Sequence, residues 1–287
     1  MLASCLSAGV MVNLIRYVST DVNTYQIVFF RNFFALLLFL PWLFFGGIKK
    51  IKTNRMNIYF LRGAVGICAM TLWFHSLSII PLTVSTALSF TVPLFVAVMS
   101  AFFFGEKYGP HRIAALIVGF IGTLIILRPG TEDFNMNSLF VLGATIFWAI
   151  SSIIIKSASS TDSPGVISFY AVLFMTPFSV PLAYLHWEEI SMVSIYWLLA
   201  LAFISNIFQV CLSIAISSTD FRVILPFDFT RLIFVAIIAY FAFDEIIDMW
   251  TSIGALVIMA SAVYASYRES LKQKNKRLHY GGIARNY

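Results

Sequence analysis

Two side chains of opposite charge, Asp228 and Arg231, stand three residues apart in an apolar stretch. On a helix this spacing places them on one face, where carboxylate and guanidinium can neutralise each other. A charge at membrane depth is costly unless it is paired or faces water, so the two residues suggest either of two roles. As a binding clamp, Asp228 would face an ammonium or sulfonium group and Arg231 a carboxylate. As a structural pair, they would lock their helix to its neighbours.

Four further residues inside apolar stretches are candidates for substrate binding: His75, Trp148, Asn206 and Gln209. His75 could bind a substrate or carry a coupled proton, because imidazole exchanges protons near neutral pH. The ring face of Trp148 could stack on a planar group or a cation. Asn206 and Gln209 share one helix face and offer amide donors and acceptors. Each residue also has an ordinary structural role, in helix packing or in hydrogen bonds between helices.

Arg31 and Arg62 also lie inside apolar stretches. Long basic side chains near the ends of a span can reach the interface with their charged heads. We therefore interpret both arginines as snorkelling side chains or as caps of the helix bundle.

The chain carries none of the motifs that mark common catalytic sites. GxSxG, HExxH, Walker and dinucleotide-binding patterns are all absent from the sequence. Cys5, Cys68 and Cys211 lie in apolar runs without metal-ligand spacing, as buried small hydrophobic residues do. We therefore expect no enzyme activity, no metal and no cofactor. Without a nucleotide-binding domain, transport would use the gradient of the substrate or of a coupled ion.

The composition is typical of a polytopic membrane protein. Hydrophobic residues make up 60% of the chain and charged residues 11%, and the mean hydropathy is +0.89. The apolar runs are about 17 to 25 residues long, as a hydrocarbon core of roughly 30 Å requires. We predict an all-α protein with ten transmembrane helices, over residues 2–18, 25–45, 57–80, 82–104, 111–127, 137–155, 165–185, 194–216, 223–243 and 249–267.

The second half of the chain repeats the first. The segment from Ala101 to Glu106 (AFFFGE) recurs as Tyr240 to Glu245 (YFAFDE), and Thr91 corresponds to Thr230 at the same offset. Five helices in each copy would place the second copy upside down, as in many secondary carriers. We predict repeats over residues 1–130 and 131–268 and a basic tail over 269–287. Glu106 and Glu245 then lie at equivalent helix ends, either as latches of one state or as simple helix-end acids.

Basic residues gather on one side of the predicted bundle: Lys49, Lys50, Lys52, Arg55, Lys107, Arg112, Lys156, Arg222, Arg268, Lys272, Lys274, Lys276, Arg277 and Arg285. The other side has only Arg16 and Arg128, with most of the acidic residues. By the positive-inside rule, both termini are cytoplasmic. The net charge of +6 therefore reflects topology, and we expect a lipid bilayer and a small-molecule substrate as partners, with no nucleic acid. The sequence specifies no oligomeric state.

Short motifs run over nearly the whole chain: Leu61-Arg-Gly63, Thr86-Ala-Leu-Ser-Phe-Thr-Val-Pro93, Phe104-Gly-Glu106, Gly119-Phe-Ile-Gly122, Arg128-Pro-Gly130, Pro226-Phe-Asp-Phe-Thr-Arg231 and Phe243-Asp-Glu245. With these motifs the chain resembles the ten-helix EamA type of the drug/metabolite transporter superfamily. The resemblance implies a secondary-active carrier in a bacterial inner membrane that works by alternating access. Its cavity would lie between the third, fourth, eighth and ninth helices, with contributions from the first and sixth. Pro93 and Pro226 mark positions where two of these helices can bend.

The block from Leu61 to Gly130 is most similar to the S-adenosylmethionine uptake carriers of bacteria that live inside host cells. The resemblance implies a substrate with a carboxylate, an ammonium, a sulfonium and a planar adenine, which Asp228, Arg231 and nearby aromatic rings could bind. The same side chains would also suit an aromatic amino acid or riboflavin. A membrane scaffold or sensor that transports nothing remains the alternative from another class.

Overall fold

The computed structural model describes residues 1–43, 53, 55–104, 110–132, 134–158, 161–218 and 228–283, and within them every regular element is a helix. The helices are α1 (Leu2–Val18), α2 (Thr24–Trp42), α3 (Met56–Ile79), α4 (Leu82–Ser89), α5 (Val92–Phe104), α6 (Pro110–Leu127), α7 (Ser138–Ala158), α8 (Pro164–Leu185), α9 (Met192–Ser218), α11 (Thr230–Phe243) and α12 (Met249–Ile283). The all-α prediction is confirmed.

The apolar segments of the described residues match the ten predicted spans. Six are long and apolar enough to cross a membrane, and shorter apolar helices occupy 2–18, 113–127, 230–243 and 249–265. The polytopic membrane fold is thus confirmed, while the orientation of the termini and the repeat boundaries stay predictions.

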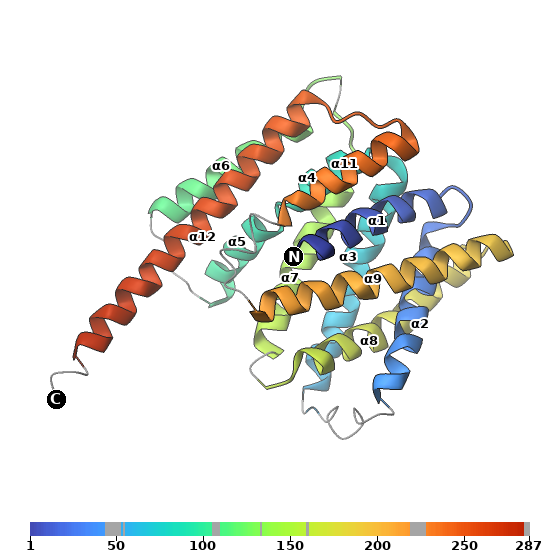
Figure 1. Ribbon diagram of the computed structural model, residues 1–287, viewed down its shortest axis with the longest axis horizontal. Helices are drawn as coiled ribbons and strands as arrows, with labels where there is room; N and C mark the ends of the chain where they lie inside the picture. The colour runs from blue at the N-terminus through green and yellow to red at the C-terminus, as the bar shows by residue number, and fades with distance from the viewer. Residues whose placement is uncertain are drawn as a thin grey trace.

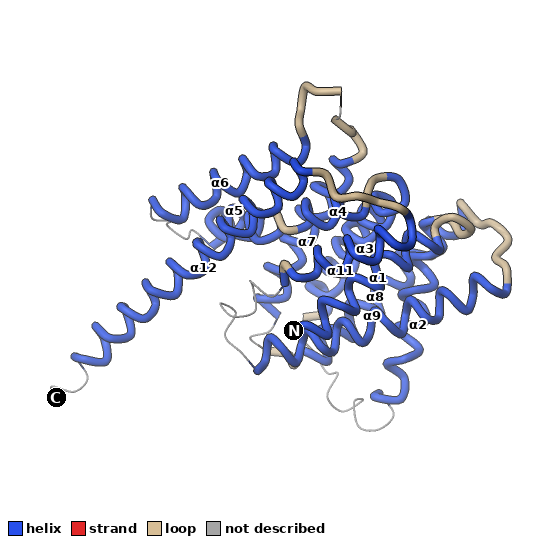
Figure 2. The backbone as a smooth tube through the Cα atoms, turned by 45° about the horizontal axis from the view of Figure 1, so that its top comes forward, coloured by secondary structure: helices blue, strands red, loops and turns tan. Residues whose placement is uncertain are grey.

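The helices pack as one bundle with a pair set to one side. In Figures 1 and 2, α6 and α12 lie side by side at one end, and α12 continues past the bundle toward the C-terminus. The remaining helices form the main body, where α1 contacts α9 and α11, α3 contacts α7 and α8, and α4 contacts α11. The helices that matter for the site, α1, α3, α4 and α11, therefore meet inside the bundle.

One predicted helix, over residues 82–104, is interrupted. It consists of α4 and α5, separated by a turn at Phe90 and Thr91. Pro93 explains the interruption, because proline has no N–H for the Ser89 carbonyl and its ring crowds that carbonyl. The amides of Phe90 and Thr91 instead bond to carbonyls three residues back, at 3.2 and 3.0 Å. The sequence predicted a bend here but not a complete break.

A matching interruption lies in the second repeat. Asp228 is helical, Phe229 lies in a turn, and α11 begins at Thr230. Pro226, which we expected to bend this helix, lies outside the described residues. Phe229 corresponds to Phe90 of the first repeat, and the two rings touch with their centroids 4.4 Å apart. The two interruptions therefore meet, and they bring Ser89 and Arg231 to the same place.

The last helix is longer than predicted. We expected it to end near Tyr267, with a basic tail after it, but α12 continues to Ile283. The sequence from Arg268 to Leu278 is rich in Lys, Arg, Leu, Glu and Gln. These unbranched residue types lose little rotamer freedom in a helix and have high helix propensity, so the helix continues where the apolar residues end.

Asp248 anchors the start of α12 and ties it to the end of α6. Its carboxylate accepts hydrogen bonds from the amides of Trp250 (2.9 Å) and Thr251 (3.1 Å), from the Thr251 hydroxyl and from the Arg128 guanidinium. Burial alone would raise the pKa of Asp248, but the bonds from Thr251 and the charge of Arg128 outweigh it and lower the pKa.

Asp248→Ala is expected to lower the free energy of unfolding by about 1 kcal/mol, since it removes a helix cap. A depressed carboxyl pKa stabilises the fold above the ordinary aspartate value of about 3.9, and this contribution is lost as pH falls through the folded-state pKa. Thermal unfolding in detergent should therefore show a difference between wild type and variant near neutrality that shrinks below about pH 4. A difference that stays constant into strong acid would contradict the cap.

Candidate substrate-binding site

A cavity of about 280 Å³ lies inside the main body of the bundle. Its walls come from α1, α2, α3, α4, α7, α9 and α11, which are the helices expected from the family resemblance with α2 added. The lining residues are Ala8, Met11, Val12, Arg31, Met70, Trp73, Phe74, Thr86, Ser89, Trp148, Phe208, Gln209 and Arg231. Three of the six predicted site residues, Trp148, Gln209 and Arg231, are thus brought together around one space.

Arg231 joins the two helix interruptions at the cavity wall. Its Nη2 donates a hydrogen bond to the Ser89 hydroxyl at 3.1 Å and lies 4.0 Å from the Asp228 carboxylate. Its guanidinium carbon lies 5.0 Å from the centre of the Phe90 ring, within range of a cation–π contact. Asp228 is not part of the lining, so it reaches the cavity only through Arg231.

Aromatic rings form much of the cavity wall. The rings of Trp73 and Trp148 lie 5.2 Å apart at an angle of 54°, and Phe74 and Phe208 complete the apolar lining. Two indole rings in a partly buried cavity offer faces for a planar ring or for a cation. Trp73 was not among the predicted site residues, because its place opposite Trp148 depends on how α3 packs against α7.

Arg31 also lines the cavity, which corrects its interpretation as a snorkelling or capping residue. Its Nη1 donates to the Asn32 side-chain oxygen at 3.1 Å and lies 4.0 Å from the Met70 sulfur. Its Nε is buried without a hydrogen-bond partner, as is the hydroxyl of Thr86. Across the part of the chain that the structure describes, Arg31 forms no ion pair. The sequence signal was the depth of Arg31 in the span beside Asn32, which we interpreted as snorkelling or capping.

His75 and Asn206 lie elsewhere. His75 lines a separate polar pocket of about 340 Å³ near the turn between α1 and α2, with Asp21 and Glu188, and its ring packs against Phe140 with centroids 5.1 Å apart. Asn206 donates to a carbonyl of its own helix at 3.0 Å. Neither belongs to the cavity lining, so neither is part of the binding site developed below.

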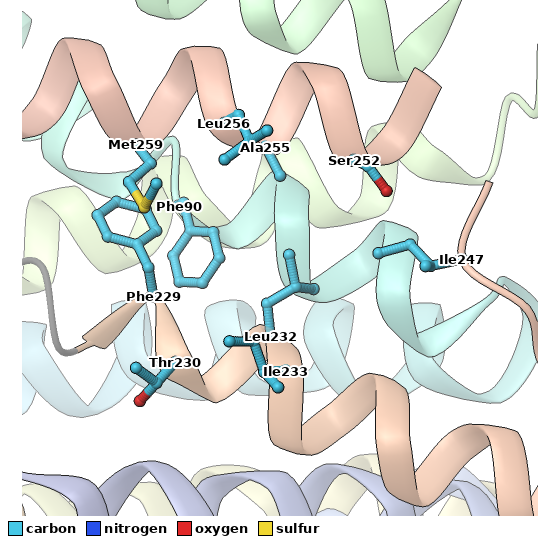
Figure 3. A pocket seen from close by; sticks show the side chains of 10 residues that line it. All are labelled: Phe90, Phe229, Thr230, Leu232, Ile233, Ile247, Ser252, Ala255, Leu256 and Met259. Atoms are coloured by element: carbon cyan, nitrogen blue, oxygen red, sulfur yellow. The ribbon is translucent and has the colours of Figure 1, made fainter. Parts of the chain in front are cut away.

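A second, apolar pocket adjoins the pair of interruptions. Figure 3 shows Phe90 and Phe229 beside Met259 and Leu256 of α12, with Leu232 and Ile233 of α11 across the pocket. Its volume is about 330 Å³, and only Thr230 and Ser252 bring polar side-chain atoms to it. Ile233 and Leu256 are 58% and 59% exposed, so this pocket opens toward the outer surface of the bundle. It lacks the convergent polar groups that a specific small-molecule site requires.

A network around Arg16 and Glu245 joins several helix ends on one side of the bundle. Arg16 Nη1 donates to the carbonyls of Leu77 (2.8 Å) and Ile80 (3.4 Å), and its Nη2 lies 3.7 Å from Glu245 Oε1. Glu245 Oε2 accepts the backbone N–H of Leu82 at 2.8 Å. These contacts join the ends of α1 and α3, the start of α4 and the residues after α11. Glu245 therefore joins these helix ends, and we call its contacts with Arg16 and Leu82 the latch; Glu106 lies outside the described residues.

The latch lies next to the cavity along three helices. Arg16 lies about one helical turn after the lining residue Val12 on α1. Leu77 lies about one turn after the lining residue Phe74 on α3. Leu82 precedes Thr86 by a similar length of α4. Because α4 runs back from the end of α3, all three helices reach the latch on the same side of the cavity.

A second set of contacts joins the other end of α3 to the start of α8. Asp162 Oδ2 accepts hydrogen bonds from the Tyr59 hydroxyl at 2.6 Å and from the Thr53 hydroxyl at 2.9 Å. Arg62 Nη1 donates to the carbonyl of Ile167 at 2.7 Å. Arg62 is thus a cap between helices, and it does not line the cavity.

Known proteins match this chain over nearly its whole length. The model of the EamA-like transporter family matches residues 1–128 and 135–267. The S-adenosylmethionine uptake transporter of Rickettsia felis is 32% identical over 91% of this chain and 89% of its own length. The riboflavin transporter of Vibrio cholerae is 31% identical over 85% of this chain and 83% of its own.

A solved crystal structure has the same fold at low sequence identity. The match covers 92% of this chain and 93% of the chain in that structure, with a TM-score of 0.58 and 15% sequence identity. At that identity the likeness supports the helical arrangement and carries no argument on substrate.

Proposed function

Because the chain belongs to the EamA-like transporter family, we propose that it is a secondary-active carrier that takes up S-adenosylmethionine across a bacterial inner membrane. The family and the apolar helices make it a multi-pass membrane transporter of a small molecule and not an enzyme. The substrate proposal is supported by the relative from Rickettsia felis, named an S-adenosylmethionine uptake transporter.

The observation that carries the proposal is the combination of indole rings and guanidinium groups in one cavity. Trp73 and Trp148 would stack on the planar adenine and shield the sulfonium, which favours aromatic faces as other cations do. Gln209 offers both a donor and an acceptor to ring nitrogens. The arginines Arg31 and Arg231 supply charge for the carboxylate end. A cavity of about 280 Å³ is close to the lower end of small-molecule sites, as a partly closed state would give.

Alternating access would open the cavity by separating the helices that the latch holds together. The Arg16–Glu245 contact spans α1, α3, α4 and the end of α11, so it must break before a substrate can pass on that side. By the distribution of basic residues this is the outer side. The contacts of Asp162 with Tyr59 and Thr53 would have the same role on the cytoplasmic side.

Glu245→Gln is expected to change how stability depends on pH. Burial raises the pKa of Glu245, although the Leu82 amide and Arg16 partly oppose this, so the folded state binds a proton more tightly than the unfolded chain. Stability relative to the variant should therefore increase as pH falls from neutrality toward the ordinary glutamate value of about 4.3. Thermal unfolding midpoints of both proteins in detergent would measure this.

The exposed residue Glu189 provides a matched control, because Glu189→Gln makes the same chemical change at a surface position outside the latch. If Glu245→Gln behaves in the same way as Glu189→Gln, the latch is not closed in the dominant state of the protein.

Riboflavin is the second candidate substrate. The relative from Vibrio cholerae is named a riboflavin transporter, and a flavin ring would also suit the faces of Trp73 and Trp148. Riboflavin carries no charge at neutral pH, so it would bring no anionic group to Arg31. The carboxylate of S-adenosylmethionine, which riboflavin lacks, favours S-adenosylmethionine.

Uptake into bacterial cells that produce the chain tests the substrate. Labelled S-adenosylmethionine should accumulate saturably, and unlabelled S-adenosylmethionine should compete, while tryptophan and riboflavin in excess should not. Competition by riboflavin or tryptophan at similar concentrations would contradict the assignment and move it to those compounds. Cells with an empty vector give the background.

A further inference from the structure

We propose that Arg31 binds the carboxylate of the transported molecule, so that the carrier selects substrates with an anionic group and rejects neutral ring compounds. The inference rests on the proposed function in one respect, that the central cavity is the transport site. It adds a residue and a chemical requirement that neither the family nor the relatives assign.

The charges around the cavity do not balance. Two guanidinium groups, of Arg31 and Arg231, belong to the lining. The Asp228 carboxylate lies 4.0 Å from Arg231 and pairs with it. No carboxylate within the described ranges pairs with Arg31, although it lies inside a span. A charge without a partner at that depth is costly, so the cavity favours a ligand whose anionic group can lie against Arg31.

The donors of Arg31 are also mostly unused. A guanidinium carries five N–H donors. Among the residues that the structure describes, only Nη1 has a partner, the side-chain oxygen of Asn32 at 3.1 Å, apart from the long contact with the Met70 sulfur. Nε is buried with no acceptor. The Thr86 hydroxyl on the cavity wall is in the same condition. The Nη groups of Arg31 could bind the two oxygens of a carboxylate, which matches the fork of a guanidinium.

Asn32 holds the arginine in place for this task. The Asn32 amide nitrogen donates to the Val28 carbonyl at 2.9 Å and is 3.4 Å from the Met70 sulfur, so its oxygen is turned toward Arg31. The guanidinium is thereby fixed on one side while the cavity is left on the other. Positioning by a side chain that is itself fixed reduces the entropy cost of binding.

The two other arginines deep in the spans have different roles. Arg231 already contacts Asp228, Ser89 and the ring of Phe90. Arg62 donates to the Ile167 carbonyl and does not line the cavity. Arg31 therefore differs from both, since it lines the cavity and has no anionic partner among the described residues. Arg62 provides a matched control of the same residue type at a similar depth.

The test compares ligands with and without the carboxylate in proteoliposomes. The pair is S-adenosylmethionine and its decarboxylated form, which keeps the adenine, the sulfonium and an ammonium. Wild-type protein should bind the first roughly 10- to 100-fold more tightly, the range of a hydrogen-bonded charged group. Arg31→Gln should remove most of this preference, because it weakens the binding of S-adenosylmethionine but not of the decarboxylated form. Arg62→Gln should keep the preference.

The opposite results would overturn the inference. One is equal transport of both forms by wild type, a comparison that does not depend on the folding of any variant. Another is an Arg31→Gln variant that folds and still prefers S-adenosylmethionine, or that binds both ligands more weakly by the same factor. Arg31→Lys, which keeps the charge but loses the fork, should fall between wild type and Arg31→Gln.

Failure of the proposed substrate is distinguishable from failure of this inference. If wild type does not transport S-adenosylmethionine, the pair of tryptophan and tryptamine, which also differ by a carboxylate, tests the same requirement. Preference for tryptophan that depends on Arg31 would support the carboxylate site with another substrate. Saturable transport of neutral riboflavin by wild type would overturn the site even though the chain is a carrier.

Discussion

Arg231→Gln is expected to reduce S-adenosylmethionine uptake roughly 100-fold, as the loss of several charge-assisted contacts would. Arg231 holds Ser89 and Phe90 of the first repeat and Asp228 of the second at the point where the two helix interruptions meet. Its removal takes a guanidinium from the cavity wall and leaves Asp228 without its cation. Uptake of labelled substrate, divided by the amount of folded carrier in the membrane, measures the effect.

The double variant Asp228→Asn, Arg231→Gln separates a structural pair from a binding pair. Both charges are then absent, so no unpaired charge remains to disturb the fold. If the pair is only structural, the double variant should regain both its normal amount in the membrane and its uptake. We expect the amount of folded protein in the membrane to return to the wild-type level while uptake stays low. Loss of uptake only in proportion to loss of folded protein would contradict a binding role and leave the carrier intact.

Gly254→Val is expected to have the largest effect on stability. A Cβ atom on Gly254 would lie 2.4 Å from Cγ1 of Ile126 and 2.7 Å from the backbone oxygen of Gly122, so α12 would have to move away from α6. Overpacking that forces a backbone shift costs about 3 kcal/mol or more, a large part of the stability of a protein. The amount of monodisperse carrier extracted from membranes, and its thermal unfolding, should both fall sharply.

Gly143 provides the matched control for this prediction. A Cβ atom there would meet only the end of the Leu72 side chain, at 3.2 Å, which can turn away. Gly143→Val should therefore leave the yield of folded protein close to that of wild type. Equal behaviour of the two variants would contradict the close approach of α6 and α12, which Figure 1 shows as a pair beside the main body.

The spans could be predicted because their signal is local. Each apolar run is long enough for a membrane, and most described helices begin and end within a few residues of the predicted limits. The break at Phe90 was missed, although Pro93 was noted, because the strength of a proline bend depends on what the chain packs against. The continuation of α12 to Ile283 was missed since only apolar residues were counted as helix.

The binding site could be predicted only in part, because some of its residues come together only when the helices pack. Spacing along one helix identified Arg231 with Asp228, and the chemistry of its side chain identified Trp148. Arg31 and Trp73 became neighbours of the same cavity only through the packing of α2, α3 and α7, which the sequence does not show. His75 was selected for its chemistry alone, and it lies in the pocket near the α1–α2 turn.

The central claim is that this chain alone transports S-adenosylmethionine through the cavity between its repeats. Purified protein in liposomes, with labelled S-adenosylmethionine outside and unlabelled compound inside, tests it directly. We expect saturable exchange in wild type that is strongly reduced in Arg231→Gln, with the amounts of folded protein matched. Wild-type vesicles that exchange no more label than empty liposomes, while they do exchange riboflavin or an amino acid, would contradict it.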